Sequence, residues 1–239
     1  MNRYQLIVSL AIVSLLQGCA SIQMVSVYYE PTEPITLVSD LNQTIELGIF
    51  DDARGTDSRW VGTVRGGYGN VLYRLTTDTP TSEVVRKAME NALGSRSINI
   101  ASNSASLSIE GEIIRLDCNY FFNREAHAHI MAKIVSQNDH ATIYSRTYRT
   151  DNTEPGIGAG IFCDIDYLAG FLNRTLSETI DKICTDPAFI DALHWNKSRQ
   201  AQSAEGIDNR LLNLETLRSK RLITESEYKA KKQQMLDEL

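Results

Sequence analysis

The chain has 239 residues, and its 30 acidic against 24 basic side chains give a formal net charge of −6 at pH 7. This acidic balance repels the phosphate backbone of nucleic acids and anionic lipid headgroups, so neither is expected as a partner through bulk charge. The length suits one domain with an accessory element, and no apolar run reaches the roughly 20 residues that a membrane-spanning helix needs.

The N-terminal segment has the layout of a secretory signal. Arg3 precedes the uncharged apolar run LIVSLAIVSLL, which is too short to span a bilayer but has the proportions of a signal-peptide h-region. The run leads into Leu16-Gln17-Gly18-Cys19, which resembles the lipobox of bacterial lipoproteins, although Gln17 replaces the usual Ala or Ser. The resemblance implies a signal peptide over residues 1–18, a diacylglyceryl thioether on Cys19 and an acylated amino terminus.

The same resemblance implies a location. Several acyl chains on Cys19 would anchor the protein stably, so the membrane is an expected partner, reached through lipid. In this class of lipoprotein an Asp after the cysteine favours the inner membrane, whereas here Ala20 follows. The resemblance therefore implies a lipid-anchored protein of the outer membrane that faces the periplasm.

Residues 19–34 contain two prolines and no sustained period, and we interpret them as the lipidated N-terminus and a tether. A folded domain is expected over residues 35–194. Alternation over residues 45–49 predicts a half-buried strand, and the glycine-rich stretch 60–75 predicts a hairpin or a loosely paired excursion. Helical spacing then predicts a helix over residues 79–94, with Thr79 or Thr81 as its cap and Gly94 as its stop.

The second half of the domain predicts a three-stranded meander followed by a long helix. The strands are expected at residues 105–122, 125–135 and 141–150, and a change of phase in the first predicts a bulge near residues 111–113. An apolar stripe over residues 165–183 predicts the helix, and Asp186-Pro187 opens a short helical turn. This order of elements predicts an α+β fold: an antiparallel sheet with two long helices packed on one face.

Short motifs between residues 47 and 93 resemble the YajG-like family of bacterial outer-membrane lipoproteins. They are an acidic-x-x-Arg turn (Asp51 and Arg54), the pair Val61-Gly62 and the pair Tyr68-Gly69, followed by the predicted helix. The resemblance implies a periplasm-facing α+β domain, and the family supplies no catalytic residues to carry over.

The C-terminal stretch has a different character. Residues 195–206 are polar and predict a linker, and residues 207–239 resemble SHOCT, a short C-terminal domain of many bacterial proteins. Thr224 and Glu227 have the spacing of a capping box, so a helical hairpin is expected. A hairpin this small is marginal alone, and we expect its apolar stripe to contact a protein partner or a second copy. The predicted contact residues are Leu211, Leu214, Tyr228, Met235 and Leu236.

Three sets of residues could suggest chemistry. Asp51 and Asp52 are best interpreted as a turn that bonds its own backbone. His127 and His129 project from one strand face at a spacing that could hold a metal, but no clear further ligand follows unless Cys118 or His140 supplies it. The glycine-rich stretch 156–160 lacks the remaining residues of a phosphate-binding loop. We therefore predict no enzyme, no metal site and no cofactor.

The cysteines other than Cys19 leave two alternatives. A straight helix over residues 165–184 separates Cys163 from Cys184 by far more than a disulfide allows. The meander brings Cys118 to the same end of the domain as Cys163, which predicts a disulfide between them and a free Cys184. Three unpaired thiols in the core are the alternative.

Three functional hypotheses remain. The first is a non-enzymatic outer-membrane lipoprotein whose domain binds or assembles a periplasmic partner and whose C-terminal hairpin mediates self-association. The second is a binder of a small molecule or an envelope polymer, with its ligand in a groove between sheet and helices. The third is a metal-dependent enzyme built around His127 and His129.

Overall fold

The computed structural model describes residues 20–32, 34–35, 37, 45–101, 105–156, 158, 163–195, 212, 214–220 and 222–237, with side chains as far as residue 233. The chain divides into two compact units, residues 1–194 and residues 195–239. The predicted signal peptide and Cys19 lie outside the described residues, as does nearly all of the predicted linker. None of the described helices is long and apolar enough to cross a bilayer.

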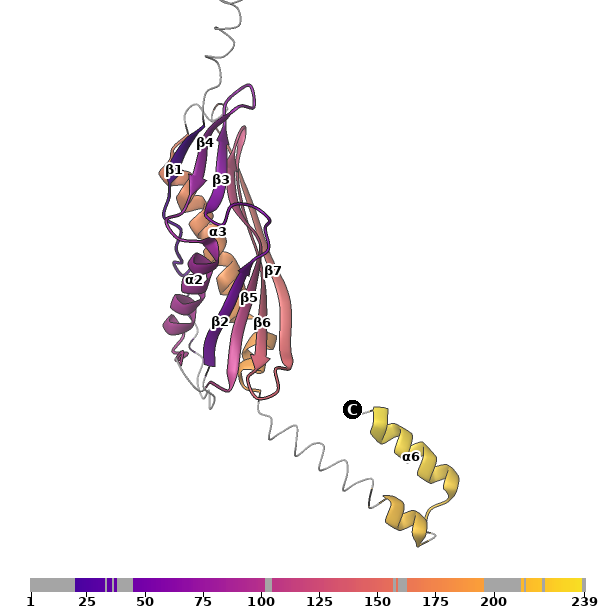
Figure 1. Cartoon of the computed structure of the whole chain (residues 1–239). Coiled ribbons are helices and arrows are strands. Elements are labelled where there is room, and N and C mark those ends of the chain that lie inside the picture. The colour runs from indigo at the N-terminus through magenta and orange to yellow at the C-terminus, as the bar shows by residue number, and fades with distance from the viewer. Residues whose placement is uncertain are drawn as a thin grey trace, which may run out of the picture. The chain divides into compact units, whose positions relative to one another are not determined.

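The first unit is a mixed α+β domain built on one seven-stranded sheet (Figure 1). Its largest part is an antiparallel meander of β5 (Leu107–Tyr120), β6 (Asn123–Ser136) and β7 (Thr142–Pro155). The predicted meander is therefore confirmed. The expected bulge is present one step further along, as a register shift between Ile113 and Arg115.

The rest of the sheet differs from the expected antiparallel arrangement. β2 (Ile45–Asp52) and β3 (Trp60–Arg65) both pair with β5 in parallel, along different stretches of that long strand. The physical reason is the connection: α2 intervenes before β5, and a strand reached through a helical crossover runs in the same direction as its partner. The sheet order is β1-β4-β3-β5-β6-β7, and β2 lies off this path beside β5.

β3 and β4 (Val71–Thr76) form the predicted hairpin, and two glycines explain its motifs. Gly69 in the turn has a φ of +80°, a conformation that side chains with a Cβ rarely adopt. Gly62 lies where β3 presses against β5, and a Cβ there would come within 2.1 Å of the Cys118 carbonyl oxygen. The Val61-Gly62 and Tyr68-Gly69 pairs are thus requirements of local geometry.

Two long helices contact the sheet and each other: α2 (Thr81–Ser95) packs on β2 and β5, and α3 (Ile165–Thr185) packs on β5, β6 and β7. Figure 1 shows both on the same side of the sheet. α2 ends one residue beyond Gly94, and Pro80 occupies its N-cap position without a side-chain cap. Neither Thr79 nor Thr81 caps the helix, because the Thr81 hydroxyl bonds to Asp52 instead. The short α4 (Pro187–Leu193) follows α3, and the Asp186 side chain accepts from its Ala188 amide.

The segment predicted as a tether is bound to the domain. β1 (Ser21–Met24) pairs in parallel with β4, and its first residue lies opposite Tyr73. The following residues 25–32, which we call the strap, run along α3: the Tyr28 amide donates to Asn173 and the Glu30 amide donates to Ser177. The tether prediction is wrong for these residues because their backbone donors and the buried Tyr29 find partners on α3.

The strap ends in a buried polar cluster. The Tyr29 hydroxyl donates to Asp181 Oδ1 at 2.7 Å, and Thr32 donates to the other oxygen through its hydroxyl and its amide. Arg96, just after α2, forms a 2.7 Å salt bridge with the same carboxylate. Strap, α2 and α3 are therefore joined at one point.

The second unit contains helical residues 214–219 and α6 (Glu225–Asp237). Thr224 and Glu227 form the expected capping box, in which the Thr224 amide donates to the carboxylate and the Glu227 amide to the Thr224 hydroxyl. An ion pair of 2.9 Å joins Arg218 to Glu225.

Candidate functional site

One face of the meander carries polar side chains while the other supplies the core. On β6, alternate residues from Ala126 to Ile134 are buried, as predicted. Their neighbours point the opposite way, and the register places them in rows across the three strands. We call this polar side of β3, β5, β6 and β7 the open face. Its two central rows are Asp117–His127–Asp151 and Arg115–His129–Arg149.

Two histidines converge on one carboxylate in the centre of the open face. His127 Nδ1 lies 2.6 Å from Asp151 Oδ1, and His129 Nε2 lies 2.9 Å from the same oxygen. Hydrogen bonding to His127 lowers the pKa of Asp151 most; burial opposes it, and the hydrogen bond to His129 adds a further lowering, so the net pKa lies below the usual value. The carboxylate is half-exposed, whereas the His127 side chain is only 11 % exposed.

Both positively and negatively charged side chains surround this cluster. Arg115 Nε donates to Asp117 at 2.7 Å, and Asn119 donates to the same carboxylate. Glu125 Oε2 lies 3.9 Å from His127 Nε2. That nitrogen is buried and has no hydrogen-bond partner among the described residues.

The sequence singled out His127 and His129 but not the third group. Asp151 is remote in sequence, and only the β6–β7 register brings it opposite His127. Cys118, a possible further ligand by sequence, is fully buried on the core side of β5. His140 lies in the turn between β6 and β7, beyond the end of both strands.

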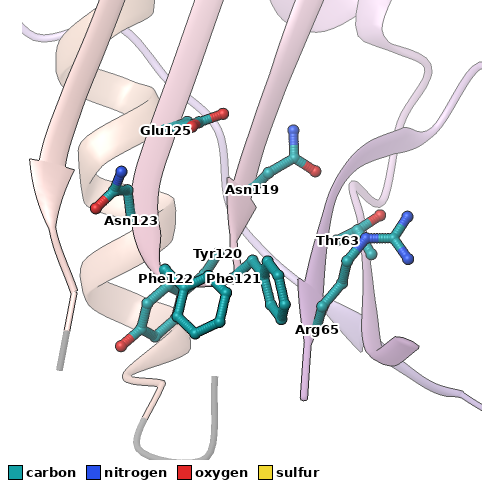
Figure 2. Close-up of a pocket in the computed structure, with 8 residues that line it drawn as sticks. All are labelled: Thr63, Arg65, Asn119, Tyr120, Phe121, Phe122, Asn123 and Glu125. Carbon is teal, nitrogen blue, oxygen red and sulfur yellow. The ribbon is translucent and has the colours of Figure 1, made fainter. Parts of the chain in front are cut away.

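A pocket of about 430 Å³ lies beside this cluster, where β3, β5 and β6 approach the β5–β6 turn (Figure 2). Figure 2 shows Arg65 and Thr63 on one side and the Phe121 and Phe122 rings at the turn. Glu125 lines the pocket and also neighbours His127. The sheet–helix groove expected to hold a ligand is instead filled by buried side chains from both layers, including Leu116, Ile130 and Leu172.

The acidic-x-x-Arg turn has a structural role. Arg54 pairs with Asp52 through two 2.7 Å hydrogen bonds that hold the pKa of Asp52 below its usual range. Its remaining donors bond to the Trp60 and Leu116 carbonyls and to the Thr81 hydroxyl. The side chain is only 4 % exposed. Arg54 therefore joins β2, β3, β5 and the start of α2.

The three described cysteines are free thiols, so the predicted Cys118–Cys163 disulfide is absent and the alternative of unpaired thiols holds in this structure. Burial raises the pKa of Cys118, and Asp117 and Cys163 contribute to the rise. Burial is the main cause of that rise, and it also raises the pKa of Cys163 to about 11. Only thiolates exchange readily, so both groups are poorly reactive.

Among the predicted contact residues, Leu214 and Tyr228 are buried, with 5 % and 7 % of their surface exposed. Tyr228 stacks under Arg218 and donates to Glu215 at 3.5 Å. Tyr228 thus contacts other side chains of the second unit, and both residues expose little surface. Leu211 and the side chains of Met235 and Leu236 lie outside the described residues.

These features define an α+β domain with a helix-covered face and an open polar face. A family model described as an uncharacterized lipoprotein matches residues 39–194, which is more than half of the chain. The chain belongs to this family of bacterial lipoproteins. No curated protein matches the sequence.

One solved structure shares the fold, and others show a more distant likeness. Protein XCC0632 from Xanthomonas campestris has 16 % identity and a TM-score of 0.51, and the match covers 76 % of this chain and 99 % of that one. PelC from Paraburkholderia phytofirmans has 11 % identity and a TM-score of 0.36, covering 62 % and 88 % of the respective chains. Lipoprotein GNA1162 from Neisseria meningitidis has 9 % identity and a TM-score of 0.29, covering 60 % and 99 %. At these identities the first likeness concerns the fold alone.

Proposed function

We propose that this protein is a non-enzymatic, YajG-like lipoprotein of the outer membrane, anchored through Cys19 and facing the periplasm. The anchor holds one end of the domain against the bilayer, and the open face binds a periplasmic protein partner. The observation that carries this proposal is the bound strap, because it leaves almost no free chain between the lipid and the fold.

The geometry of the N-terminus limits the distance to the membrane. Ser21 is already paired with β4, and only two Cα–Cα steps of about 3.8 Å separate it from Cys19. The glycerol carrying the acyl chains would therefore lie within roughly 10 Å of the sheet. A domain held this closely cannot rotate freely, so one of its ends faces the lipid.

That end carries exposed aromatic side chains. The β3–β4 turn presents Tyr68, which is fully exposed, and the β5–β6 turn presents Phe122, which is 60 % exposed. Both turns lie at the same end of the sheet as Ser21 and the start of α3, where Tyr167 is 47 % exposed. Aromatic rings favour the bilayer interface, where their apolar bodies leave water. We propose that this aromatic end rests in the headgroup region.

The experiment uses the lipidated protein in phosphatidylcholine vesicles that contain bromine-labelled lipid. Tyr68→Trp and Phe122→Trp are each made with Trp60 and Trp195 replaced by Phe. Their fluorescence should be quenched by the bromine. The matched control is Asn138→Trp in the β6–β7 turn at the opposite end of the meander, which should not be quenched. Equal quenching of all three, or none, would reject the proposed orientation.

The open face is then presented to the periplasm beside the membrane. Its mixed charges and its pocket suit a polar surface of a folded protein better than a membrane or a nucleic acid. Stable capture of one envelope protein that is lost on Glu125→Arg, but retained on Glu178→Arg of α3, would support this surface. Co-purification of a lipid or glycan without any protein would favour the second hypothesis, a small-molecule or polymer binder, with the pocket at Arg65 as its site.

We further propose that the SHOCT-like second unit mediates self-association. Leu212 and Leu222 remain 64 % and 66 % exposed after the unit has buried Leu214 and Tyr228. Exposed leucines on so small a unit favour contact with a second copy. Mass measurement by light scattering on the mature chain and on a chain ending at residue 204 tests this, since equal numbers of protomers per particle would reject it.

A further inference from the structure

We infer that His127, His129 and Asp151 form a binding site for a first-row divalent transition metal such as Zn²⁺. Two imidazole nitrogens and one carboxylate oxygen lie within 4.8 Å of one another on adjacent strands. Two histidines with one carboxylate are a common ligand set for zinc and its neighbours in the periodic table. This inference does not depend on the membrane contact or on a protein partner.

The backbone holds the ligands ready. His127 and His129 are two residues apart on β6, so both side chains leave the same face. Asp151 faces His127 across the β6–β7 ladder, one of many consecutive register pairs in the middle of two long strands. A site on paired strands in the centre of a sheet needs little rearrangement to bind an ion. The present distances of 2.6 and 2.9 Å to one carboxylate oxygen are hydrogen bonds that an ion would replace.

A polar atom without a partner points to the missing ligand. When neutral His127 donates its Nδ1 proton to Asp151, its Nε2 becomes an acceptor, and this atom is buried without a hydrogen bond. If Nδ1 binds a metal instead, the proton moves to Nε2, and Nε2–H then faces Glu125 Oε2, which is 3.9 Å away. A carboxylate behind a ligating histidine is the usual outer partner in such sites. Metal binding would therefore give this nitrogen a proton to donate, and a shift of the Glu125 side chain by less than about 1 Å would bring its carboxylate into hydrogen-bond range.

The charges nearby permit a cation. Arg115 and Arg149 flank His129 in the register, but Arg115 is paired with Asp117 at 2.7 Å. Asp151 and Glu125 both border the site. The half-exposed Asp151 leaves the outer side of the ion open, so the three protein ligands would be completed by water.

The test is calorimetric titration of the mature chain in detergent with ZnCl₂, followed by titration with Co²⁺ monitored by absorption. We expect one ion per chain and Co²⁺ bands typical of nitrogen and oxygen ligands. His129→Asn and Asp151→Asn should each weaken Zn²⁺ binding at least tenfold. His140→Asn, outside the cluster, is the matched control and should leave binding unchanged.

Two measurements keep the outcome interpretable. Circular dichroism checks that each variant is folded, which matters most for His127, whose side chain is nearly buried. The Cys163→Ser variant excludes a thiol site, because a thiolate would add an intense near-ultraviolet band with Co²⁺. Absence of binding to the folded wild-type protein, or equal binding by folded Asp151→Asn, would overturn the inference.

Discussion

Tyr29 of the strap and Asp181 of α3 are joined by a buried 2.7 Å hydrogen bond, 152 residues apart in sequence. Burial raises the pKa of Tyr29 to about 12, so the phenol keeps the proton that it donates. Arg96 neutralises the same carboxylate from the end of α2. The bond fixes the chain that follows the predicted lipid site, and it thereby couples anchoring to folding.

Removing this hydroxyl should loosen the strap. Tyr29→Phe keeps the ring but deprives Asp181 of one donor, and hydrogen bonds to charged groups contribute about 1.5 to 3 kcal/mol. We expect a drop of that size in the free energy of unfolding in urea and faster amide exchange over residues 21–32. Tyr28→Phe is the control, because that side chain is 49 % exposed. Equal losses for the two variants would contradict the role given to Tyr29.

Acid should weaken the same junction. Burial raises the pKa of Asp181, but hydrogen bonds from Thr32, Tyr29 and Arg96 outweigh it, and the net pKa lies below the ordinary value. A carboxyl with a lowered folded-state pKa stabilises the protein above its unfolded pKa of about 3.9. This contribution is lost as the pH falls through the folded value.

Urea unfolding at a series of pH values from 7 to 3 measures this effect. We expect stability to fall steeply below about pH 4. Asp181→Asn should be less stable at pH 7, because Arg96 loses its charge partner, and should lose less on acidification. Parallel acid profiles for the two proteins would show that Asp181 does not contribute.

Arg54 should be essential for stability and dispensable for binding. Removing one partner of a buried pair costs about 3 to 5 kcal/mol, and Arg54→Ala also leaves the Trp60 and Leu116 carbonyls without this donor. Chemical unfolding should therefore show a large loss for Arg54→Ala and almost none for the exposed Arg59→Ala. A small loss at Arg54 would mean that its bonds are replaced by water.

The sequence predicted those parts of the fold that local periodicity determines. The meander, α2 and α3 have clear periods of two or 3.6 residues, so their positions were found to within a few residues. The parallel pairing of β2 and β3 with β5 depends on contacts between distant segments, and no local pattern encodes it. The strap escaped notice because its bonds are mostly made by backbone amides to α3.

The candidate site likewise has one part that the local sequence predicts and one part that depends on strand pairing. The His-x-His spacing was visible because both residues lie on one strand. The role of Asp151 was not visible, because the sequence near residue 151 does not indicate which residue of β6 it faces. Its only signal was the register of the meander, and a strand that slips by one residue changes which face its side chains occupy. The prediction of no metal site rested on that missing ligand.

The last prediction concerns the thiols. Cys163 is partly exposed, whereas Cys118 and Cys184 are buried. Burial raises the pKa of Cys163 to about 11 and that of Cys184 to about 12. We expect native alkylation to be slow and confined to Cys163, with a rate that rises about tenfold per pH unit between pH 7 and 9, because only the thiolate reacts.

Cys163→Ser should abolish native labelling, and all three thiols should label after unfolding without reductant. Mass mapping of the labelled peptides measures each site separately. If neither Cys118 nor Cys163 is labelled in the unfolded, unreduced protein, and the peptide containing one is found linked to the peptide containing the other, the disulfide that the sequence predicts would be established instead.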